Sequence, residues 1–209
     1  MNPVSASNPF AREPNRWWQL VFGLIAMMAI SSPQYVWALF TKPLTASLGA
    51  PLAEVQVAFS LLIVLQTFLA PFQGYLIDKF GPRLLMSAGA ALTGLSWVLS
   101  AGVHSLWGIY FAYGVLGGIG TGIIYVGVVG LMVQWFPDKR GLAAGLVAAG
   151  YGFGAILTTF PIANSLTSAG LSHTLMVYGV IIGVVGLLAA QGMHRPRRDQ
   201  IARVTASEE

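Results

Sequence analysis

Long apolar stretches alternate with short polar segments along the whole chain. Six such stretches are present, at residues 17–40, 55–77, 84–103, 106–136, 141–166 and 172–193. None of them contains Asp, Glu, Lys or Arg. A helix that rises about 1.5 Å per residue needs about 20 apolar residues to cross a hydrocarbon core of roughly 30 Å. The pattern therefore predicts six transmembrane helices joined by short loops.

Transmembrane β-strands are the competing interpretation, because Val and Ile are frequent in these stretches. Barrel strands would be segments of about 10 residues in which apolar and polar positions alternate. The observed stretches are continuous and much longer, and a helix satisfies its backbone hydrogen bonds internally, as lipid requires. We therefore expect an all-α membrane protein.

Composition supports this fold class and limits the chemistry. Of the 209 residues, 56% are hydrophobic and 9% are charged, whereas soluble domains carry roughly a quarter charged residues. We expect one transmembrane domain, residues 17–193, between a polar tail at 1–16 and a basic tail at 194–209. The first stretch exceeds the roughly 7–15 apolar residues of a cleavable signal peptide, so we expect it to be retained. The absence of cysteine excludes disulfides and thiol chemistry.

The net charge of +4 would also suit a nucleic-acid-binding protein. The placement of the basic residues along the chain decides between nucleic-acid binding and membrane orientation. When the 11 Lys and Arg residues are assigned to alternate sides of six spans, Lys42 alone falls on one side. The other side holds Arg12, Arg16, Lys79, Arg83, Lys139, Arg140, Arg195, Arg197, Arg198 and Arg203. By the positive-inside bias this side is cytoplasmic. We therefore expect both termini in the cytoplasm, an inner-membrane location, and lipid rather than nucleic acid as partner.

Small and aromatic residues predict how the helices pack. Glycines four residues apart let a neighbouring helix approach closely. Such pairs occur at Gly114, Gly118 and Gly122, at Gly141 and Gly145, at Gly150 and Gly154, and at Gly179 and Gly183. Prolines inside spans favour kinks, here at Pro33, Pro71 and Pro161. Aromatic residues near span ends indicate anchoring at the membrane surface, at Trp17, Trp18, Trp107, Tyr110, Trp135 and Phe136.

Uncharged polar residues inside the spans are the candidates for a binding site, because exposure to lipid would cost them their hydrogen bonds. At 100° per residue, Gln56, Ser60 and Thr67 share one face of the second span, and Gln66 and Gln73 form a second stripe. Further pairs on one face are Ser31 with Gln34, Thr121 with Tyr125, and Tyr151 with Thr158. Spans three and six carry fewer such stripes, and hydrogen bonds between helices are the alternative role.

The segment between the second and third stretches packs one carboxylate and two cations around a tight reversal. Gly81 permits the turn, Pro82 suits the start of the next helix, and Asp78 lies close to that start. A solvated charged loop is the simplest interpretation. However, Gly74, Asp78, Gly81 and Arg83 match the Gly-x-x-x-Asp-x-x-Gly-x-Arg loop signature, and the segment resembles the major facilitator superfamily at the expected place.

This resemblance implies one half of a two-half fold, in which each half is an inverted pair of three-helix repeats. It implies a cytoplasmic gating role for Asp78 and Arg83. It also implies that spans one, two, four and five face a central cavity, and that residues 194–209 form a tail or begin the loop between halves. The expected partner is then a C-terminal half or a second copy of the chain. A split gene or a fragment would have the same sequence.

A narrower resemblance covers residues 16–193. The segments 32–37, 135–145 and 149–154, together with Gln56, look like the oxalate/formate antiporter family. That likeness implies substrate-contact roles, which we assign to Gln34, Tyr35, Gln56, Tyr125 and Tyr151. Tyrosine hydroxyls and glutamine amides can donate hydrogen bonds to a carboxylate.

The sequence therefore favours secondary transport of small carboxylates by alternating access. The alternatives are a proton-coupled monocarboxylate carrier, such as one for lactate, and a non-transporting remnant or scaffold. An intramembrane enzyme is disfavoured because the spans contain no Cys, no acidic residue and no paired His, and we expect no metal or cofactor. The spans also contain no Arg or Lys to balance an anion, and the resemblance implies that such cations belong to the C-terminal half.

Overall fold

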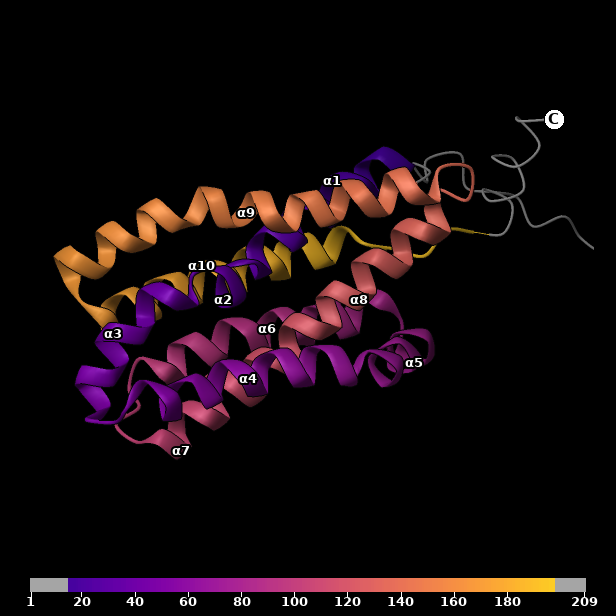
Figure 1. The fold of residues 1–209 in the computed structure, drawn as a ribbon. Helices are drawn as coiled ribbons and strands as arrows, with labels where there is room; N and C mark the ends of the chain where they lie inside the picture. The colour runs from indigo at the N-terminus through magenta and orange to yellow at the C-terminus, as the bar shows by residue number, and fades with distance from the viewer. Residues whose placement is uncertain (1–14, 198–209) are drawn as a thin grey trace, which may run out of the picture.

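The computed structural model describes residues 15–197, so of the predicted tails at 1–16 and 194–209 only residues 15–16 and 194–197 are described. The described chain is helical, without a strand, and runs back and forth as antiparallel rods (Figure 1). In chain order the rods are α1 (Arg16–Ile30) with α2 (Ser32–Tyr35) and α3 (Trp37–Leu48); α4 (Leu52–Phe68) with α5 (Ala70–Phe80); α6 (Pro82–Ser100); α7 (Leu106–Ile109) with the π-helix η1 (Tyr110–Leu116) and α8 (Gly117–Trp135); α9 (Arg140–Ala169); and α10 (Leu171–Gly192).

Most of these rods have the length and apolarity that a bilayer demands. Among the described residues, three helical segments qualify unaided, at Leu106–Trp135, Arg140–Ala169 and Leu171–Gly192. The two bent rods, α1 to α3 and α4 to α5, raise the number to five when each is counted as one span. The remaining rod, α6, is a 19-residue helix that begins beside Arg83 and buries Thr93 and Ser96. These hydroxyls lower its hydropathy but bond to carbonyls of the same helix, from Thr93 to Gly89 at 2.9 Å and from Ser96 to Thr93 at 2.8 Å.

Breaks in the helices lie beside two of the three predicted proline kinks. The first rod bends by 43° at Val36, next to the short helix α2 that contains Pro33. The second bends by 56° at Leu69, two residues before Pro71. At Pro161, in contrast, α9 continues without interruption to Ala169. The structure adds a feature that was not predicted, the seven-residue π-helix η1 at the start of the fourth rod.

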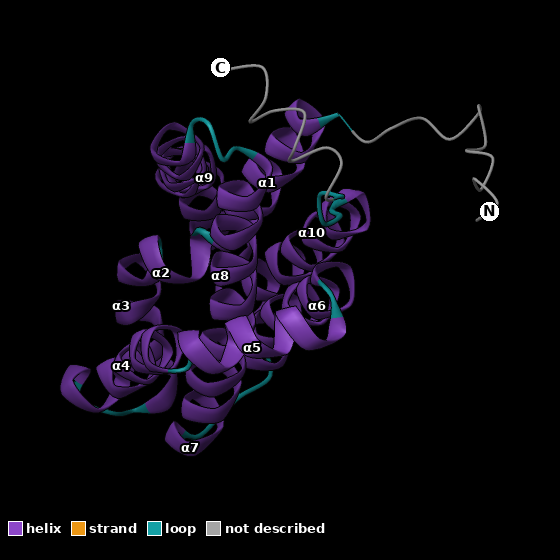
Figure 2. Ribbon diagram, turned by 90° about the vertical axis from the view of Figure 1, so that its right-hand side faces the viewer, coloured by secondary structure: helices purple, strands orange, loops and turns teal. Residues whose placement is uncertain are grey.

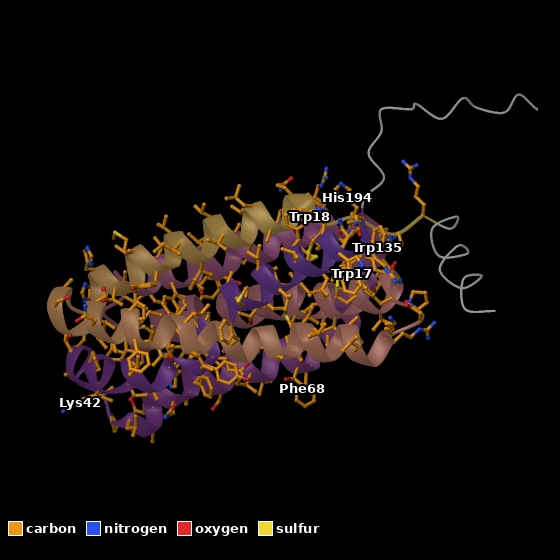
Figure 3. The ribbon with its side chains drawn as sticks, turned by 90° about the horizontal axis from the view of Figure 1, so that it is seen from above. Trp17, Trp18, Lys42, Phe68, Trp135 and His194 are labelled. Atoms are coloured by element: carbon orange, nitrogen blue, oxygen red, sulfur yellow. The ribbon has the colours of Figure 1, made fainter. Side chains whose placement is uncertain are left out.

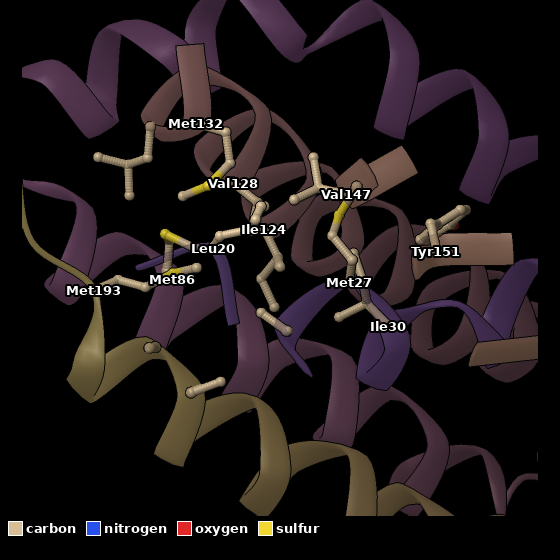
Figure 4. Close-up of a cluster of buried hydrophobic side chains, with 14 of the residues drawn as sticks. Leu20, Met27, Ile30, Met86, Ile124, Val128, Met132, Val147, Tyr151 and Met193 are labelled. Atoms are coloured by element: carbon tan, nitrogen blue, oxygen red, sulfur yellow. The ribbon is translucent and has the colours of Figure 1, made fainter. Parts of the chain in front are cut away.

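The interior consists of two apolar clusters stacked along the bundle. One cluster includes Met27, Met86, Ile124, Val128 and Met132, which converge from α1, α6 and α8 (Figure 4). The other gathers around buried aromatic side chains at the opposite end, where Trp97 meets Phe40 edge-on with ring centroids 5.2 Å apart. Together the two clusters contain side chains from every rod. The faces that stay exposed are those that a bilayer would cover.

Close backbone contact fixes the pair α6 and α10. A Cβ atom placed on Gly94 would lie 2.7 Å from the Gly179 carbonyl oxygen and 2.7 Å from the Gly183 Cα. The predicted glycine faces of the fourth and sixth spans are thus confirmed as packing surfaces, with Gly114 and Gly118 against α4. In the fifth span, Gly150 and Gly154 pack on α1, whereas a Cβ atom placed on Gly141 or Gly145 would meet no described residue within 4 Å.

The two ends of the bundle differ in charge and in aromatic residues. Trp17, Trp18, Trp135 and His194 lie at the end where the described chain begins and finishes, and Lys42 lies at the opposite end (Figure 3). Trp17, Trp18 and Trp107 are exposed, as anchoring side chains should be. Trp135 and Phe136 are buried, so the anchoring role predicted for them is wrong. They are packed into the protein because the loop before α9 folds back against α1, where Arg16 contacts Asp138 at 3.1 Å.

Candidate functional site

A cavity of about 720 Å³ opens between α2, α4, α8 and α9, near the middle of the bundle. Viewed along the rods, α2, α4 and α9 lie on one side of the bundle, α6 and α10 lie on the other, and α8 lies between them (Figure 2). The described residues that line the cavity are Gln34, Tyr35, Gln66, Thr67, Ala70, Tyr125, Val126, Val129, Gly130, Ala148 and Tyr151. The lining thus comes from rods one, two, four and five.

The break in the first rod is what brings Gln34 and Tyr35 to the cavity. Three contacts hold the short helix α2 against its neighbours. The Tyr113 hydroxyl of η1 donates to the Pro33 carbonyl at 2.6 Å, and the Ser32 hydroxyl donates to the Thr158 hydroxyl oxygen of α9 at 2.9 Å. The third contact is the hydrogen bond from Tyr151 to Gln34. A polar turn that would be costly in lipid is therefore tied to the fourth and fifth rods.

Three tyrosines form the aromatic wall of the cavity. Tyr151 lies between the other two, with its ring centroid 5.4 Å from that of Tyr35 and 5.5 Å from that of Tyr125, both edge-on. Its hydroxyl donates to Gln34 Oε1 at 2.8 Å. Tyr151 is buried, whereas Tyr35 is 51% exposed. The aromatic wall is therefore held by packing at Tyr151 and is open at Tyr35. Edge-on aromatic pairs of this kind add stability beyond the area they bury.

Gln66 completes the polar lining, although it was not among the predicted site residues. Its side-chain oxygen accepts a hydrogen bond from the Thr121 hydroxyl at 3.4 Å, which links α4 to α8. The described lining contains amides and hydroxyls but no Asp, Glu, Lys or Arg. Such a surface can donate hydrogen bonds to a carboxylate without supplying a countercharge. Gln66 belonged to a recognised polar stripe of the second span, and this was the available signal.

The remaining predicted substrate residue, Gln56, is not brought to the cavity. Its side-chain oxygen accepts a hydrogen bond from Trp37 Nε1 at 2.7 Å, and Trp37 also stacks on Phe59 with centroids 5.8 Å apart. Gln56 precedes Gln66 by ten residues on α4, which is roughly 15 Å along the helix axis. In this structure Gln56 joins the first and second rods near the end that carries Lys42.

The predicted gating segment is more helical than its sequence suggests. Helix α5 continues through Asp78 to Phe80, and the reversal reduces to Gly81, whose φ of 92° lies in a region that favours glycine. Pro82 begins α6 as predicted. Gly74 lies within α5, where it has only ordinary contact with Val126. The Asp78 carboxylate accepts a hydrogen bond from Arg195 at 3.1 Å, and does not pair with Arg83.

Arg195 belongs to a group of contacts that sequence reasoning missed, and Arg83 contacts one member of this group, His194. We call this group the terminal clasp, formed by Gln19, Trp135, Gly192, His194 and Arg195. The Trp135 indole donates to the His194 carbonyl at 2.7 Å, and Gln19 exchanges hydrogen bonds of 2.9 Å with the Gly192 carbonyl and the His194 amide. Arg195 donates to the Ile77 carbonyl at 2.7 Å, and the Arg83 guanidinium contacts the His194 ring.

The terminal clasp places the segment after α10 across the ends of α1, α5 and α8. The sequence signals for it were Gln19, a glutamine within the first span, and Trp135; the structure buries both. The predicted gating residues thus meet the chain that leaves the sixth rod. A movement of that chain would displace Arg195 and so change its contact with Asp78.

Comparison with known proteins finds one matching family and several similar proteins. Residues 15–208 match the sequence profile of the Major Facilitator Superfamily. The chain is 41% identical over 177 residues to the oxalate:formate antiporter of Oxalobacter formigenes, covering 84% of this chain and 42% of that protein. It is 31% identical over 173 residues to an MFS-type transporter of Escherichia coli, YhjX, covering 83% of this chain and 43% of the relative.

Human monocarboxylate transporter 14 is a more distant relative, 30% identical over 122 residues, which are 58% of this chain and 24% of that protein. The chain spans less than half the length of each of these three relatives.

Proposed function

The chain belongs to the major facilitator superfamily, and from this and its cavity we propose that it is the N-terminal half of a secondary transporter for small organic anions. It is an integral membrane protein, since both its family and its apolar helices require a bilayer. Transport would proceed by alternating access, with this half rocking against a second one. We propose oxalate and formate as substrates because the relative from Oxalobacter formigenes is an oxalate:formate antiporter.

The observation that carries the proposal is the tyrosine and glutamine lining of the cavity. The Tyr151 hydroxyl and the amides of Gln34 and Gln66 are held by packed helices, and all three face the same space of about 720 Å³. Rigid donors lose little conformational entropy when they bind a ligand. We therefore assign substrate contact to Gln34, Tyr35, Gln66, Tyr125 and Tyr151, and we leave Gln56 out because it lies outside the cavity.

The charge of the substrate requires a second partner surface. A carboxylate that leaves water loses its hydration, and this costs several kcal/mol unless an opposite charge offsets it. The described cavity lining offers hydrogen bonds but no cation. We propose that a C-terminal half, or a second copy of the chain, covers the cavity and supplies that cation.

We propose the end with the terminal clasp as the cytoplasmic end. Arg16, Lys79, Arg83, Arg140 and Arg195 belong to the side assigned as cytoplasmic from the sequence, whereas Lys42 lies at the opposite end of the bundle (Figure 3). This bias favours a cytoplasmic location for the basic end in a cell's inner membrane. The gate formed around Asp78 and Arg195 would then close the cytoplasmic side.

A second candidate is a monocarboxylate carrier. It is favoured by the uncharged lining, because a single negative charge costs less to desolvate than the two charges of oxalate. Similarity to monocarboxylate transporter 14 points in the same direction. In this case lactate-like substrates would bind at the same tyrosines.

The test is counterflow into proteoliposomes that contain the product of the complete reading frame. Labelled oxalate, formate and lactate are each offered to vesicles preloaded with unlabelled formate. Uptake of oxalate or formate that depends on the internal formate supports exchange. Uptake of lactate that depends on an inward proton gradient, and not on internal formate, supports the second candidate. Failure of all three to enter, with protein correctly inserted, would contradict both.

A further inference from the structure

A second cavity, of about 630 Å³, lies at the ends of α6 and α10 beside the terminal clasp, away from the proposed substrate cavity. The described residues that line it are Phe80, Gly81, Pro82, Arg83, Leu84, Ser87, Gln191, Met193, His194 and Arg195. Farther along the same pair of helices, the close contact of Gly94 with Gly179 and Gly183 holds α6 and α10 together.

The polar part of this cavity is cationic. Arg83 and Arg195 line it together with the His194 ring, and the described lining contains no carboxylate. Arg195 contacts Asp78, which is not among the lining residues, and the Arg83 guanidinium contacts the His194 ring. Ser87 accepts a hydrogen bond from Gln191 at 2.9 Å on the adjoining wall. Guanidinium groups match the oxygens of a phosphate in both geometry and charge.

The apolar part of the same site faces outward. Leu84 lines the cavity and is 62% exposed, and Leu188, one turn before Gln191 on α10, is 67% exposed. Exposed apolar side chains continue along α10 toward the middle of the bundle through Val184 and Ile181. The cationic cavity therefore lies directly at the end of an apolar stripe that a bilayer would cover.

We propose that this cavity binds the phosphate headgroup of an anionic phospholipid, with the acyl chains lying along Leu84 and Leu188. Basic pockets between transmembrane helices at a membrane surface suit such headgroups. The apolar stripe distinguishes a lipid from a soluble anion, because a free phosphate would gain nothing from it. The site requires only that the chain lies in a bilayer, and does not depend on the proposed transport activity.

The site would also link lipid to the gating segment. Arg195 lines the cavity and also contacts Asp78. A bound headgroup would therefore compete with the Asp78 carboxylate for the Arg195 guanidinium. Gly81 and Pro82, which form the reversal, line the cavity as well. An occupied site would therefore favour one arrangement of this end of the protein.

The test is native mass spectrometry of the purified 209-residue chain in detergent, titrated with phosphatidylglycerol or with phosphatidylcholine of the same acyl chains. We expect phosphatidylglycerol to bind more tightly. The double variant R83Q/R195Q should lower that affinity roughly 30-fold, the effect of two cations near an anionic headgroup. The variant R83K/R195K, which keeps the charge but not the guanidinium geometry, should lose less affinity than R83Q/R195Q. Leu188→Ser should weaken binding while leaving the cations in place.

The matched control is Arg140→Gln, which removes an exposed cation of the same end that is not among the lining residues. It should bind phosphatidylglycerol like the unaltered chain. Equal affinity for the two lipids, or unchanged affinity in folded R83Q/R195Q, would overturn the proposal. So would full displacement of the lipid by millimolar inorganic phosphate, since this would identify a soluble-anion site. If R83Q/R195Q does not fold, the lipid preference of the unaltered chain and Leu188→Ser decide.

Discussion

The hydroxyl of Tyr113, in the π-helix η1, donates a hydrogen bond of 2.6 Å to the backbone carbonyl of Pro33 in the broken first rod. Both residues are buried. The contact joins the π-helix η1, which departs from the α-helical hydrogen-bond pattern, to the short helix α2 of the interrupted first rod. It thereby fixes the turn that presents Gln34 and Tyr35 to the proposed substrate cavity.

Replacing Tyr113 by Phe should test this relationship. The change leaves the Pro33 carbonyl buried without its donor, which typically costs about 1–3 kcal/mol. We expect a lower free energy of unfolding in detergent and weaker carboxylate binding. The control is Tyr110→Phe, because the Tyr110 hydroxyl donates to the Glu54 carbonyl in an exposed position. Equal stability of the two variants would show that the contact does not fix the turn.

Removing the Tyr151 hydroxyl should affect ligand binding more than folding. Tyr151→Phe keeps both edge-on ring contacts but loses the hydrogen bond to Gln34 and one donor to the proposed substrate. We expect roughly tenfold weaker carboxylate affinity, equivalent to about 1.4 kcal/mol. Binding isotherms of the variant and of Tyr178→Phe, which lies outside this cavity, provide the measurement. Matching affinities in the two variants would remove Tyr151 from the site.

The Asp78 carboxylate should matter for transport and little for stability. Its side chain is 72% exposed and its pair with Arg195 is solvated, so the pair contributes about 0–1 kcal/mol. We expect Asp78→Asn to reduce the transport rate while the amount of inserted protein stays near the unaltered level. Initial uptake rates normalised to inserted protein provide the measurement, with Lys42→Gln at the opposite end as control. Unchanged transport would remove the gating role.

The contact between α6 and α10 should not tolerate a methyl group. In Gly94→Ala the new Cβ would lie 2.7 Å from backbone atoms of Gly179 and Gly183, so the helices must separate. Overpacking of this kind typically costs about 1–3 kcal/mol. We expect a lower midpoint of thermal unfolding in detergent. Gly145→Ala places its methyl in open space and should unfold like the unaltered chain. An unchanged unfolding midpoint for Gly94→Ala would mean that α6 and α10 can separate at this interface without loss of stability.

Sequence reasoning found most of the candidate cavity, although for two different reasons. Polar residues in spans must face protein or water, so stripes that include Gln34, Tyr125 and Tyr151 could be recognised without a structure. Resemblance to a family then selected individual members. Gln56 and Gln66 lie on the same helix, and only the axial position of the neighbouring rods decides that Gln66 reaches the cavity while Gln56 meets Trp37.

The helical class could be predicted from the sequence, because a bilayer imposes length and apolarity requirements on each segment separately. Such requirements can be evaluated one stretch at a time. The family could be predicted from the residues of the loop after the second span. Tertiary structure alone decided the π-helix, the burial of Trp135 and Phe136, and the pairing of Asp78 with Arg195 rather than with the nearby Arg83. These features depend on how the rods are rotated and shifted against one another, and that arrangement arises from packing between residues far apart in the chain.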